Sequence, residues 1–334
     1  MDCIHCGNCT RHCDFLKKYQ LDLEGFSQHP ELAYHCFLCG ECTACCPKGI
    51  DGREIALKMR CKKVEEQNGV FSKVPEIKRQ KMLVMEKKNY LFRNYRHSTS
   101  GSVLFPGCNF PSFYPKTTQK LIELLKEHAD MGVVLDCCGK PIFELGMEKE
   151  SKAICDELSK RLHQSGVTEL VVLCPNCYAF LKKHLDIPVV SIYQKLIELN
   201  LVQPLRKEHF PLYLPCPDRH SREMFESFIP LLQGQIEEIK GIQCCGLGGC
   251  AAACEPEISA GFGQKMKEQK LSKIYTYCAS CAGNFFRAGC QEVRHLLVEL
   301  LQTEEQPPKG VKSLFNRAKY KLVVNKFIDQ KKGF

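Results

Sequence analysis

Tryptophan is absent from this sequence of 334 residues, and no motif combines aromatic with basic residues as nucleic-acid-binding modules do. Long apolar runs are also missing. The longest are short stretches such as residues 170–173, far below the roughly 18 residues that a membrane-spanning helix needs. Met1-Asp2-Cys3 does not open a basic region followed by an apolar stretch, so we expect no secretory signal. These absences predict a cytoplasmic protein with no nucleic acid as partner and with at most peripheral contact at the inner face of the membrane.

A dinucleotide-binding fingerprint is missing too, because no Gly-x-Gly-x-x-Gly follows a predicted strand. Gly246, Gly248 and Gly249 do not form a phosphate loop, since no Lys follows them. We therefore expect no flavin or nicotinamide on this chain, so any flavin must lie on a partner protein. The three glycines are instead expected to let backbone amides approach metal-bound sulfur.

Cysteine, in contrast, is abundant, with 24 residues in the chain. Disulfide frameworks belong mainly to secreted proteins, so without a secretory signal these cysteines are expected to bind metal or to act in redox chemistry. The formal net charge of +9 counts every cysteine as neutral, whereas a metal-bound cysteine is a thiolate. The true charge balance is therefore less basic than the formula suggests.

Eight cysteines near the N-terminus form two quartets with the spacing Cys-x2-Cys-x2-Cys-x3-Cys. The quartets are Cys3, Cys6, Cys9, Cys13 and Cys36, Cys39, Cys42, Cys46. Three thiolates spaced by two residues can wrap one face of an iron–sulfur cubane, and the fourth iron needs a distant cysteine. A structural zinc site would instead require two separated pairs. The quartets therefore predict two 4Fe-4S cubane clusters.

This spacing resembles that of the two-cluster bacterial ferredoxins, in which the fourth ligand comes from the other motif. The resemblance implies that Cys3, Cys6, Cys9 and Cys46 bind one cubane and that Cys36, Cys39, Cys42 and Cys13 bind the other. Asp14 follows Cys13 where these ferredoxins usually have Pro, which weakens the first motif. Helix-compatible residues 15–23 between the motifs favour a mainly α-helical ferredoxin fold. Cys45 is left over and is expected to be a core residue.

From residue 101 onward, short apolar runs alternate with helical patterns, at residues 103–105, 117–128, 132–135, 148–164 and 170–173. Such alternation is typical of α/β domains with mostly parallel sheets. The same order recurs after Phe210, and the cysteines set the register of the repeat. The matching sets are Cys108, Cys137, Cys138, Cys174, Cys177 and Cys216, Cys244, Cys245, Cys278, Cys281. Two such sets predict an internal duplication.

Four of these cysteines, Cys108, Cys174, Cys216 and Cys278, each follow a predicted strand, at the carboxyl edge where open α/β sheets place their ligands. Soft thiolates gathered at that edge suit iron–sulfur or another soft metal. The alternative, that the ten cysteines of both sets are buried and inert, is disfavoured by their number and order.

The Cys-Cys-Gly sequences at Cys137-Cys138-Gly139 and Cys244-Cys245-Gly246 resemble a domain of the catalytic subunit of heterodisulfide reductase. The same domain occurs in iron–sulfur subunits of glycolate oxidase, anaerobic glycerol-3-phosphate dehydrogenase and lactate-utilisation systems. The resemblance implies that each five-cysteine set holds a noncubane 4Fe-4S cluster, giving one or two further clusters at which a small disulfide is reduced. It also implies a redox partner, either a flavoprotein or a ferredoxin-type electron donor. The alternative is a non-catalytic electron-transfer subunit of a flavoprotein dehydrogenase that oxidises glycolate, lactate or glycerol 3-phosphate.

The sequence thus predicts a multidomain protein, with an N-terminal, mainly α-helical two-cluster ferredoxin and two tandem α/β Cys-Cys-Gly domains. The expected bounds are 1–60 for the ferredoxin, 61–100 for a helical connector, 101–205 and 206–305 for the two Cys-Cys-Gly domains, and 306–334 for a basic tail. Residues 312–332 of the tail are expected to form a basic amphipathic helix.

Several other residues have weaker signals. Pro217 follows Cys216 where relatives commonly carry His, and the nearby His220 is the candidate to substitute for it, while His295 is expected to be a packed or surface residue. Cys250 and Cys254 are either a reactive thiol pair or core residues, and core is favoured. Cys61, Cys155 and Cys290 are expected to be structural.

Overall fold

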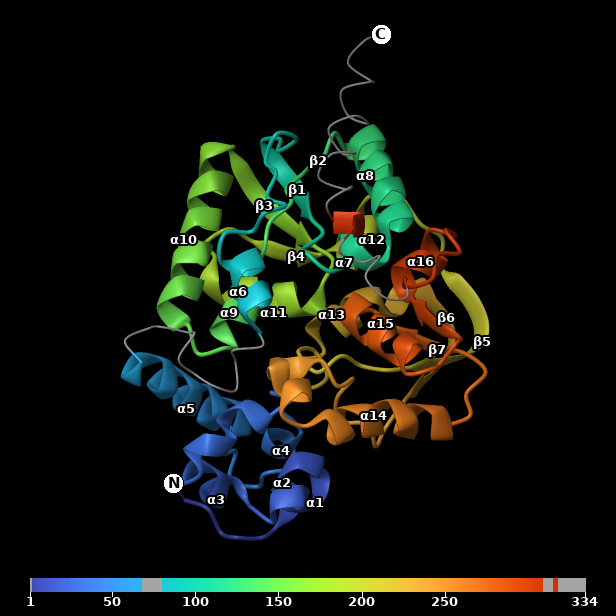
Figure 1. Cartoon of the computed structure of the whole chain (residues 1–334). Helices are drawn as coiled ribbons and strands as arrows, with labels where there is room; N and C mark the ends of the chain where they lie inside the picture. Colours follow the sequence, from blue (N-terminus) through green and yellow to red (C-terminus); the bar gives the residue numbers. More distant parts are fainter. Residues whose placement is uncertain (1, 68–79, 309–314, 318–334) are drawn as a thin grey trace. The chain divides into compact units, whose positions relative to one another are not determined.

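The computed structural model describes residues 2–67, 80–308 and 315–317 (Figure 1). These residues form two compact units, each built from stretches far apart in the sequence. Unit 1 comprises residues 1–89, 141–152 and 240–270, and unit 2 comprises residues 90–140, 153–239 and 271–334. The predicted domain bounds follow the sequence repeat, whereas these units follow spatial contacts, and the bounds therefore stay a prediction.

Among its described residues, unit 1 contains only helices and loops. They are α1 (Asn8–His12), α2 (Asp14–Tyr19), α3 (Leu23–Ser27), η1 (Pro30–His35), α4 (Glu41–Ala44), α5 (Gly52–Glu66), α6 (Lys81–Lys88), α9 (Lys140–Phe143), η5 (Gly248–Ala253) and α14 (Pro256–Glu268). Two carboxylates cap helix N-termini: Asp22 accepts from the N–H of Gly25 in α3, and Asp51 accepts from the N–H of Arg53 in α5.

The helix expected over residues 15–23 is split in two. The α2 helix ends at Gln20, which has a left-handed backbone with φ of 54°, and α3 then starts at Leu23. Phe15 and Leu16 from α2 and Leu23 and Phe26 from α3 form a core that also contains cysteines of both quartets. The rings of Phe15 and Phe26 pack edge to face with their centroids 5.1 Å apart.

Unit 2 contains two four-stranded parallel sheets, with strand orders β2-β1-β3-β4 and β6-β5-β7-β8. The strands are β1 (Gly101–Phe105), β2 (Gly132–Val133), β3 (Val167–Val172), β4 (Val189–Ser191), β5 (Leu205–Leu212), β6 (Leu232–Glu238), β7 (Ile274–Thr276) and β8 (Val293–His295). Both sheets have their first strand between the second and the third, so the same topology occurs twice. This repetition is what an internal duplication predicts.

Helices connect the strands of each sheet or follow its last strand. They are α7 (Phe110–Phe113), α8 (Pro115–Ala129), α10 (Glu148–Gln164), α11 (Pro175–His184), α12 (Ile192–Glu198), α13 (Glu223–Phe228), η4 (Ile229–Leu231), α15 (Ala279–Arg287) and α16 (Leu296–Leu300), and α10 begins within unit 1. Buried strands with helical crossovers are typical of parallel sheets. Val103, Leu104, Val171 and Val172 in β1 and β3 are fully buried or nearly so. The expected α/β architecture with parallel sheets is confirmed.

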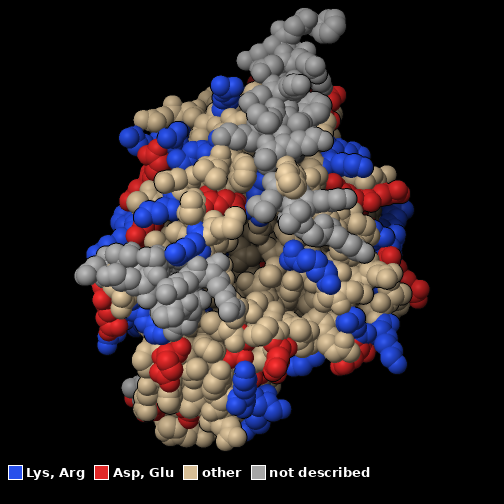
Figure 2. Space-filling view, viewed as in Figure 1, with Lys and Arg blue, Asp and Glu red and all other residues tan. Residues whose placement is uncertain are grey.

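The predicted tail helix over residues 312–332 lies outside the described residues except at 315–317, where the chain is helical. There the side-chain amide of Asn316 donates to the carbonyl oxygen of Ser112, 3.0 Å away. Among the described residues no helix is both long and apolar enough to cross a membrane. Figure 2 shows Lys and Arg interspersed with Asp and Glu over the face drawn, rather than gathered into one basic stripe.

Candidate metal centres

The two N-terminal cysteine loops of unit 1 share one backbone conformation. His5 and Leu38, each just before the second cysteine of its quartet, are both left-handed, with φ of 48° and 53°. Gly7 and Gly40, each just after that cysteine, are also left-handed, with φ of 71° and 79°. A left-handed residue other than Gly is uncommon, so its occurrence at the same position in both loops marks a shared structural requirement. In each loop the next residue starts a helix that carries the third cysteine.

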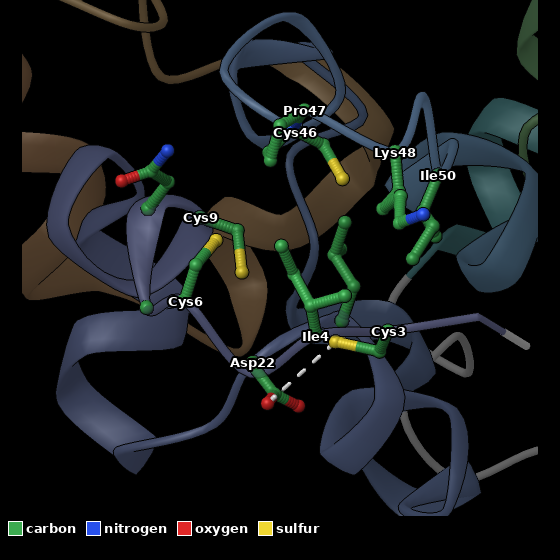
Figure 3. Close-up of a pocket in the computed structure, with 12 residues that line it drawn as sticks. Cys3, Ile4, Cys6, Cys9, Asp22, Cys46, Pro47, Lys48 and Ile50 are labelled. Carbon is green, nitrogen blue, oxygen red and sulfur yellow. Dashed lines mark hydrogen bonds between the residues drawn. The ribbon is translucent and has the colours of Figure 1, made fainter.

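Cys46 lies with the first loop. A pocket is lined by Cys3, Cys6, Cys9 and Cys46 together with apolar side chains that include Ile4, Leu23 and Ile50 (Figure 3). The fourth cysteine of the second quartet therefore completes a set of four thiols around the first loop. Four thiols with an apolar wall are a fitting donor set for a soft metal cluster.

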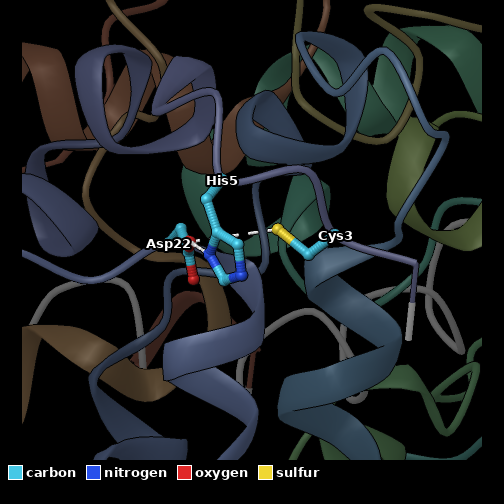
Figure 4. A group of neighbouring side chains, drawn as sticks. All are labelled: Cys3, His5 and Asp22. Carbon is cyan, nitrogen blue, oxygen red and sulfur yellow. Dashed lines mark hydrogen bonds and ion pairs between the residues drawn. The ribbon is translucent and has the colours of Figure 1, made fainter.

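Cys3 also has two polar neighbours, His5 and Asp22 (Figure 4). The ligand atoms of the three residues lie within 4.8 Å of one another. The carboxylate of Asp22 contacts the ring of His5 at 2.6 Å and caps α3 through the N–H of Gly25, and both contacts lower the pKa of Asp22. Asp22 is thus already committed to the helix cap, and Cys3 has three other thiols in its pocket. We therefore assign Cys3 to the thiol set.

Cys13 lies with the second loop. Burial raises the pKa of Cys42 well above its ordinary value, and the nearby thiols of Cys36, Cys13 and Cys39 raise it further. Burial likewise raises the pKa of Cys13 to about 11. Buried thiols this close together cannot all ionise unless a cation offsets their charge, and an iron–sulfur cluster does this when it binds. Cys13, Cys36, Cys39 and Cys42 thus fit a second cubane.

This second site also contacts two polar side chains, which no pattern in the sequence identified. Arg60 is fully buried and donates to the carbonyl oxygen of Cys36 at 2.8 Å, and its charge opposes the effect of burial on the pKa of Cys36. The side-chain amide of Gln243 donates to the sulfurs of both Cys13 and Cys39, each 3.6 Å away. Both residues take their places through contacts between distant segments, which no local sequence pattern reveals.

All five cysteines of the first Cys-Cys-Gly set lie in unit 2. Cys108 follows β1, Cys137 and Cys138 follow β2, Cys174 directly precedes α11, and Cys177 lies in its first turn. Each therefore sits beyond the carboxyl end of a parallel strand, as expected. Gly107 is left-handed with φ of 70°, and a Cβ atom there would lie 3.1 Å from the sulfur of Cys177. The absence of a side chain at residue 107 keeps space beside the thiols.

The thiols of this set interact directly. Hydrogen bonds from Cys137 and Cys177 lower the pKa of Cys138, and a hydrogen bond from Cys177 also lowers the pKa of Cys174. In these contacts Cys177 is the protonated partner, with one S–H facing the sulfurs of Cys138 and Cys174, so its own pKa rises. The nearby thiolate of Cys108 opposes this effect and raises the pKa of Cys138. This convergence of five sulfurs fits a metal cluster held by thiolates.

The second Cys-Cys-Gly set is divided between the two units. In unit 2, Cys216 follows β5, Cys278 directly precedes α15 and Cys281 lies in its first turn, matching the first set. In unit 1, the sulfur of Cys244 accepts from the N–H of Gly246 at 3.2 Å, as expected for a glycine amide close to a ligand sulfur. Gly246 and its counterpart Gly139 are both left-handed. That these cysteines form one site stays a prediction.

Within unit 2, the two halves of the duplication meet at their cysteine motifs. Asn176, which lies between Cys174 and Cys177, donates to the sulfur of Cys278 at 3.9 Å. Asn109, which follows Cys108, donates to the hydroxyl oxygen of Ser280 at 2.8 Å. Asn176 and Ser280 occupy matching positions in the two Cys-x2-Cys motifs. Asn176, between two cysteines of the first set, therefore contacts a cysteine of the second, and Ser280 of the second motif contacts the residue after Cys108.

The remaining candidates show structural contacts. His295 is buried between the rings of Phe110 and Tyr114, accepts from the N–H of Leu297, and has its pKa lowered to about 3 by burial. Its imidazole is thus neutral and caps α16. The thiols of Cys45, Cys155 and Cys61 donate to the carbonyl oxygen of Cys42, the carbonyl oxygen of Cys138 and the carboxylate of Glu148, respectively. Cys250 is left-handed within η5, Cys254 and His220 are not buried, and Cys290 is buried.

Comparison with known proteins matches residues 102–182 to the cysteine-rich domain family termed CCG, and this range contains the whole first set. Over 202 residues the chain is 27% identical to lactate utilization protein A from Geobacillus thermodenitrificans (strain NG80-2), which covers 51% of this chain and 80% of that protein. These two findings support an iron–sulfur, metal-binding protein with an electron-transfer role.

Solved structures give only distant likenesses. A glutamate racemase from Bacillus anthracis is 12% identical and aligns over 61% of this chain and 79% of its own, with a TM-score of 0.34. An aspartate racemase from Picrophilus torridus is 11% identical and aligns over 63% of this chain and 97% of its own, with a TM-score of 0.33. At these TM-scores neither likeness bears on the fold or the activity of this chain.

Proposed function

We propose that this chain is an oxidoreductase that carries electrons from two 4Fe-4S cubanes to clusters held by the Cys-Cys-Gly sets, where a disulfide is reduced. The observation that carries the proposal is the meeting of the two Cys-Cys-Gly halves in unit 2, where Asn176 of the first motif contacts Cys278 of the second. Clusters bound at these two motifs could each receive one sulfur of a disulfide.

The clusters, when bound, would supply single electrons and iron that can accept a thiolate. Cleaving one disulfide consumes two electrons and two protons and yields two thiols. The chain contributes buried thiols that would hold the clusters away from water, since Cys137 has no exposed surface and Cys138 and Cys177 are each 3% exposed. The side-chain amides of Asn109 and Asn176 fix the two motifs against each other.

Disulfide reduction tests the proposal directly. Anaerobically reconstituted protein, reduced with dithionite that is then removed, should release thiols from a panel of small disulfides. Cys177→Ser should abolish this activity because it removes a ligand of the first set. Cys290→Ser, which removes another buried thiol of unit 2 that belongs to neither set, should leave it unchanged. Wild-type protein with spectroscopically intact clusters that releases no thiol from any disulfide would refute the proposal.

The second candidate is a non-catalytic electron-transfer subunit of a flavoprotein dehydrogenase for glycolate, lactate or glycerol 3-phosphate. The likeness to lactate utilization protein A favours it. In that case electrons would enter from a flavin on the partner and leave through the clusters. Purification from the native host under anaerobic conditions distinguishes the two candidates. Stoichiometric copurification with a flavoprotein, without disulfide reduction, would support the subunit role.

A further inference from the structure

Gln243 has its side chain fixed at both ends within unit 1. Its carbonyl oxygen accepts from the backbone N–H of Asp14 at 2.8 Å, and its amide nitrogen donates to the sulfurs of Cys13 and Cys39. The bond from Asp14 determines the orientation of the amide, because a flipped amide would set two donors against each other. The side chain is buried, with an exposed fraction of 6%. It is therefore a preorganised donor to two proposed ligands of the second cubane.

The position of Gln243 in the sequence gives this contact its meaning. Gln243 directly precedes Cys244, whereas Asp136 directly precedes Cys137 in the first half. Asp136 accepts from the hydroxyl of Tyr95 at 2.8 Å and from the N–H of Cys137 at 2.7 Å, and it forms an ion pair with Arg93. The residue directly before Cys-Cys-Gly thus differs between the two halves. In the second half it is Gln243, whose side-chain amide donates to the thiols of the second cubane site.

The loop after Cys244 also lies close to the second cysteine loop. A Cβ atom on Gly248 would be 2.2 Å from the carbonyl oxygen of Phe37, and one on Gly249 would be 2.6 Å from that of Cys36. The same Cβ on Gly248 would be 3.7 Å from the sulfur of Cys244. These approaches are possible only because both residues are Gly. They place Cys244 next to the second cubane site.

The pocket of the first cubane site is lined by residues from positions 3–50. The contacts of Gln243, Gly248 and Gly249, in contrast, lead from the Cys244 loop to the second site.

We propose that Gln243 is a positioning residue that couples the second cubane to Cys244, so that electrons leave the ferredoxin module through the site of Cys13, Cys36, Cys39 and Cys42. This inference rests on the proposed occupancy of the sites by clusters. In each transfer one electron leaves the reduced cubane and one is gained by the acceptor at the Cys-Cys-Gly site, and two transfers with two protons reduce one disulfide. The hydrogen bonds from the side-chain amide of Gln243 stabilise the more negative, reduced state of the cubane and so raise its reduction potential.

EPR-monitored redox titration of the anaerobic full-length holoprotein tests this role. In Gln243→Leu one of the two cubane signals should titrate at a lower potential, because two donors to its thiolates are lost. In Gln243→Glu, which keeps the shape of the side chain, the same signal should move further in that direction, because a negative charge is added. Gln264→Leu and Gln264→Glu are matched controls on the exposed face of α14 and should move neither signal.

Unchanged potentials of both cubanes in the Gln243 variants, at wild-type iron content, would overturn the inference, and so would equal shifts of both signals. If Gln243→Leu does not fold, the isosteric Gln243→Glu still decides the matter. The disulfide assay separates this inference from the proposed function. If one cubane potential shifts but no disulfide releases thiol, the role of Gln243 is supported and the proposed disulfide reduction is refuted. If thiol is released but neither cubane potential shifts, disulfide reduction is supported and the role of Gln243 is refuted.

Discussion

Arg60 illustrates, at the scale of single residues, how unit 1 holds a charge without exposing it. Its guanidinium donates to the carbonyl oxygens of Ala33, Cys36, Glu144 and Gly249, at 2.6 to 2.9 Å, and lies over the ring of Tyr34. The planar fork of five N–H donors suits Arg for this task and could not be replaced by Lys. One side chain thus connects α5 with three other segments of unit 1.

Replacing Arg60 should be costly. Arg60→Met would leave four carbonyl oxygens without this donor, three of them in buried contacts, and we expect the free energy of unfolding to fall by at least about 3 kcal/mol. Denaturation of anaerobic holoprotein by guanidinium chloride, followed by far-UV circular dichroism, measures this. Lys58→Met on the exposed face of the same helix is the control, and it should change stability by less than about 1 kcal/mol, because its ion pair with Glu54 is exposed. Equal losses in both variants would contradict the role of Arg60.

Glu255 is a buried carboxylate that binds three side chains of the N-terminal helices. It accepts from Lys18 at 2.6 Å and from Tyr19 at 2.7 Å, and it contacts His35 at 2.6 Å, while its own side chain has no exposed surface. Burial alone would raise the pKa of Glu255, but the hydrogen bonds from Lys18, His35 and Tyr19 outweigh it and hold the pKa below the ordinary value. The carboxylate is therefore ionised at neutral pH.

We expect Glu255→Gln to lower the free energy of unfolding by about 2 kcal/mol at neutral pH, because charged hydrogen bonds are lost. A folded-state pKa below the ordinary 4.5 means that this contribution is fully present above pH 4.5 and disappears as the pH falls further. The difference between wild type and variant, measured by thermal unfolding, should thus shrink below that pH. Glu268→Gln on the exposed face of α14 should show no such difference, and a constant difference down to the lowest pH would refute the assignment.

At the scale of elements, the two adjacent cysteines at the end of α4 have different surroundings. Cys46 lines the pocket of the first loop, whereas Cys45 is the C-cap of α4 and its thiol donates to the carbonyl oxygen of Cys42. Cys46→Ser should therefore remove or damage one cubane, with a loss of up to about four irons per chain. Cys45→Ser should retain the iron content of the wild type. Iron analysis of anaerobically purified variants decides between the two, and loss of iron in Cys45→Ser alone would reverse the assignment.

Several elements could be predicted from the sequence because their apolar pattern is regular. The expected helix over residues 148–164 is α10 in full, and the strands expected near residues 103–105 and 170–173 are β1 and β3. The beginning of β5 could not be predicted, because residues 206–209 are polar and exposed and show no strand pattern. Most of β6 is also exposed, since it lies at the edge of its sheet.

The candidate sites were predictable to a different extent. Cysteine spacing identified the loops and the duplication, because metal ligation imposes close spacing along the chain. Gln243, Arg60 and Glu255 were not identified, because their partners lie far away in the sequence and a single polar residue carries no periodic signal. One clue was present for Gln243: the residue directly before each Cys-Cys-Gly is polar in both halves.

At the scale of the whole molecule, the chain returns twice to its N-terminal part. Residues 141–152 and 240–270 belong to unit 1, although both lie within the stretches that form the repeat. The second of these segments carries Cys244 and Cys245. A sequence repeat does not reveal such an exchange, because it orders residues along the chain and not in space. Cys244 and Cys245 thus belong to the same unit as the two N-terminal cysteine quartets.

Metal analysis shows whether thiol sites in both units of the chain hold iron–sulfur clusters. Iron and acid-labile sulfide should be quantified on anaerobically purified full-length protein, together with EPR spectra of the oxidised and reduced states. We expect about sixteen irons and about sixteen sulfides per chain, corresponding to four 4Fe-4S clusters. About eight irons, with only cubane signals, would contradict the claim for the Cys-Cys-Gly sets, and zinc in place of iron would contradict it altogether.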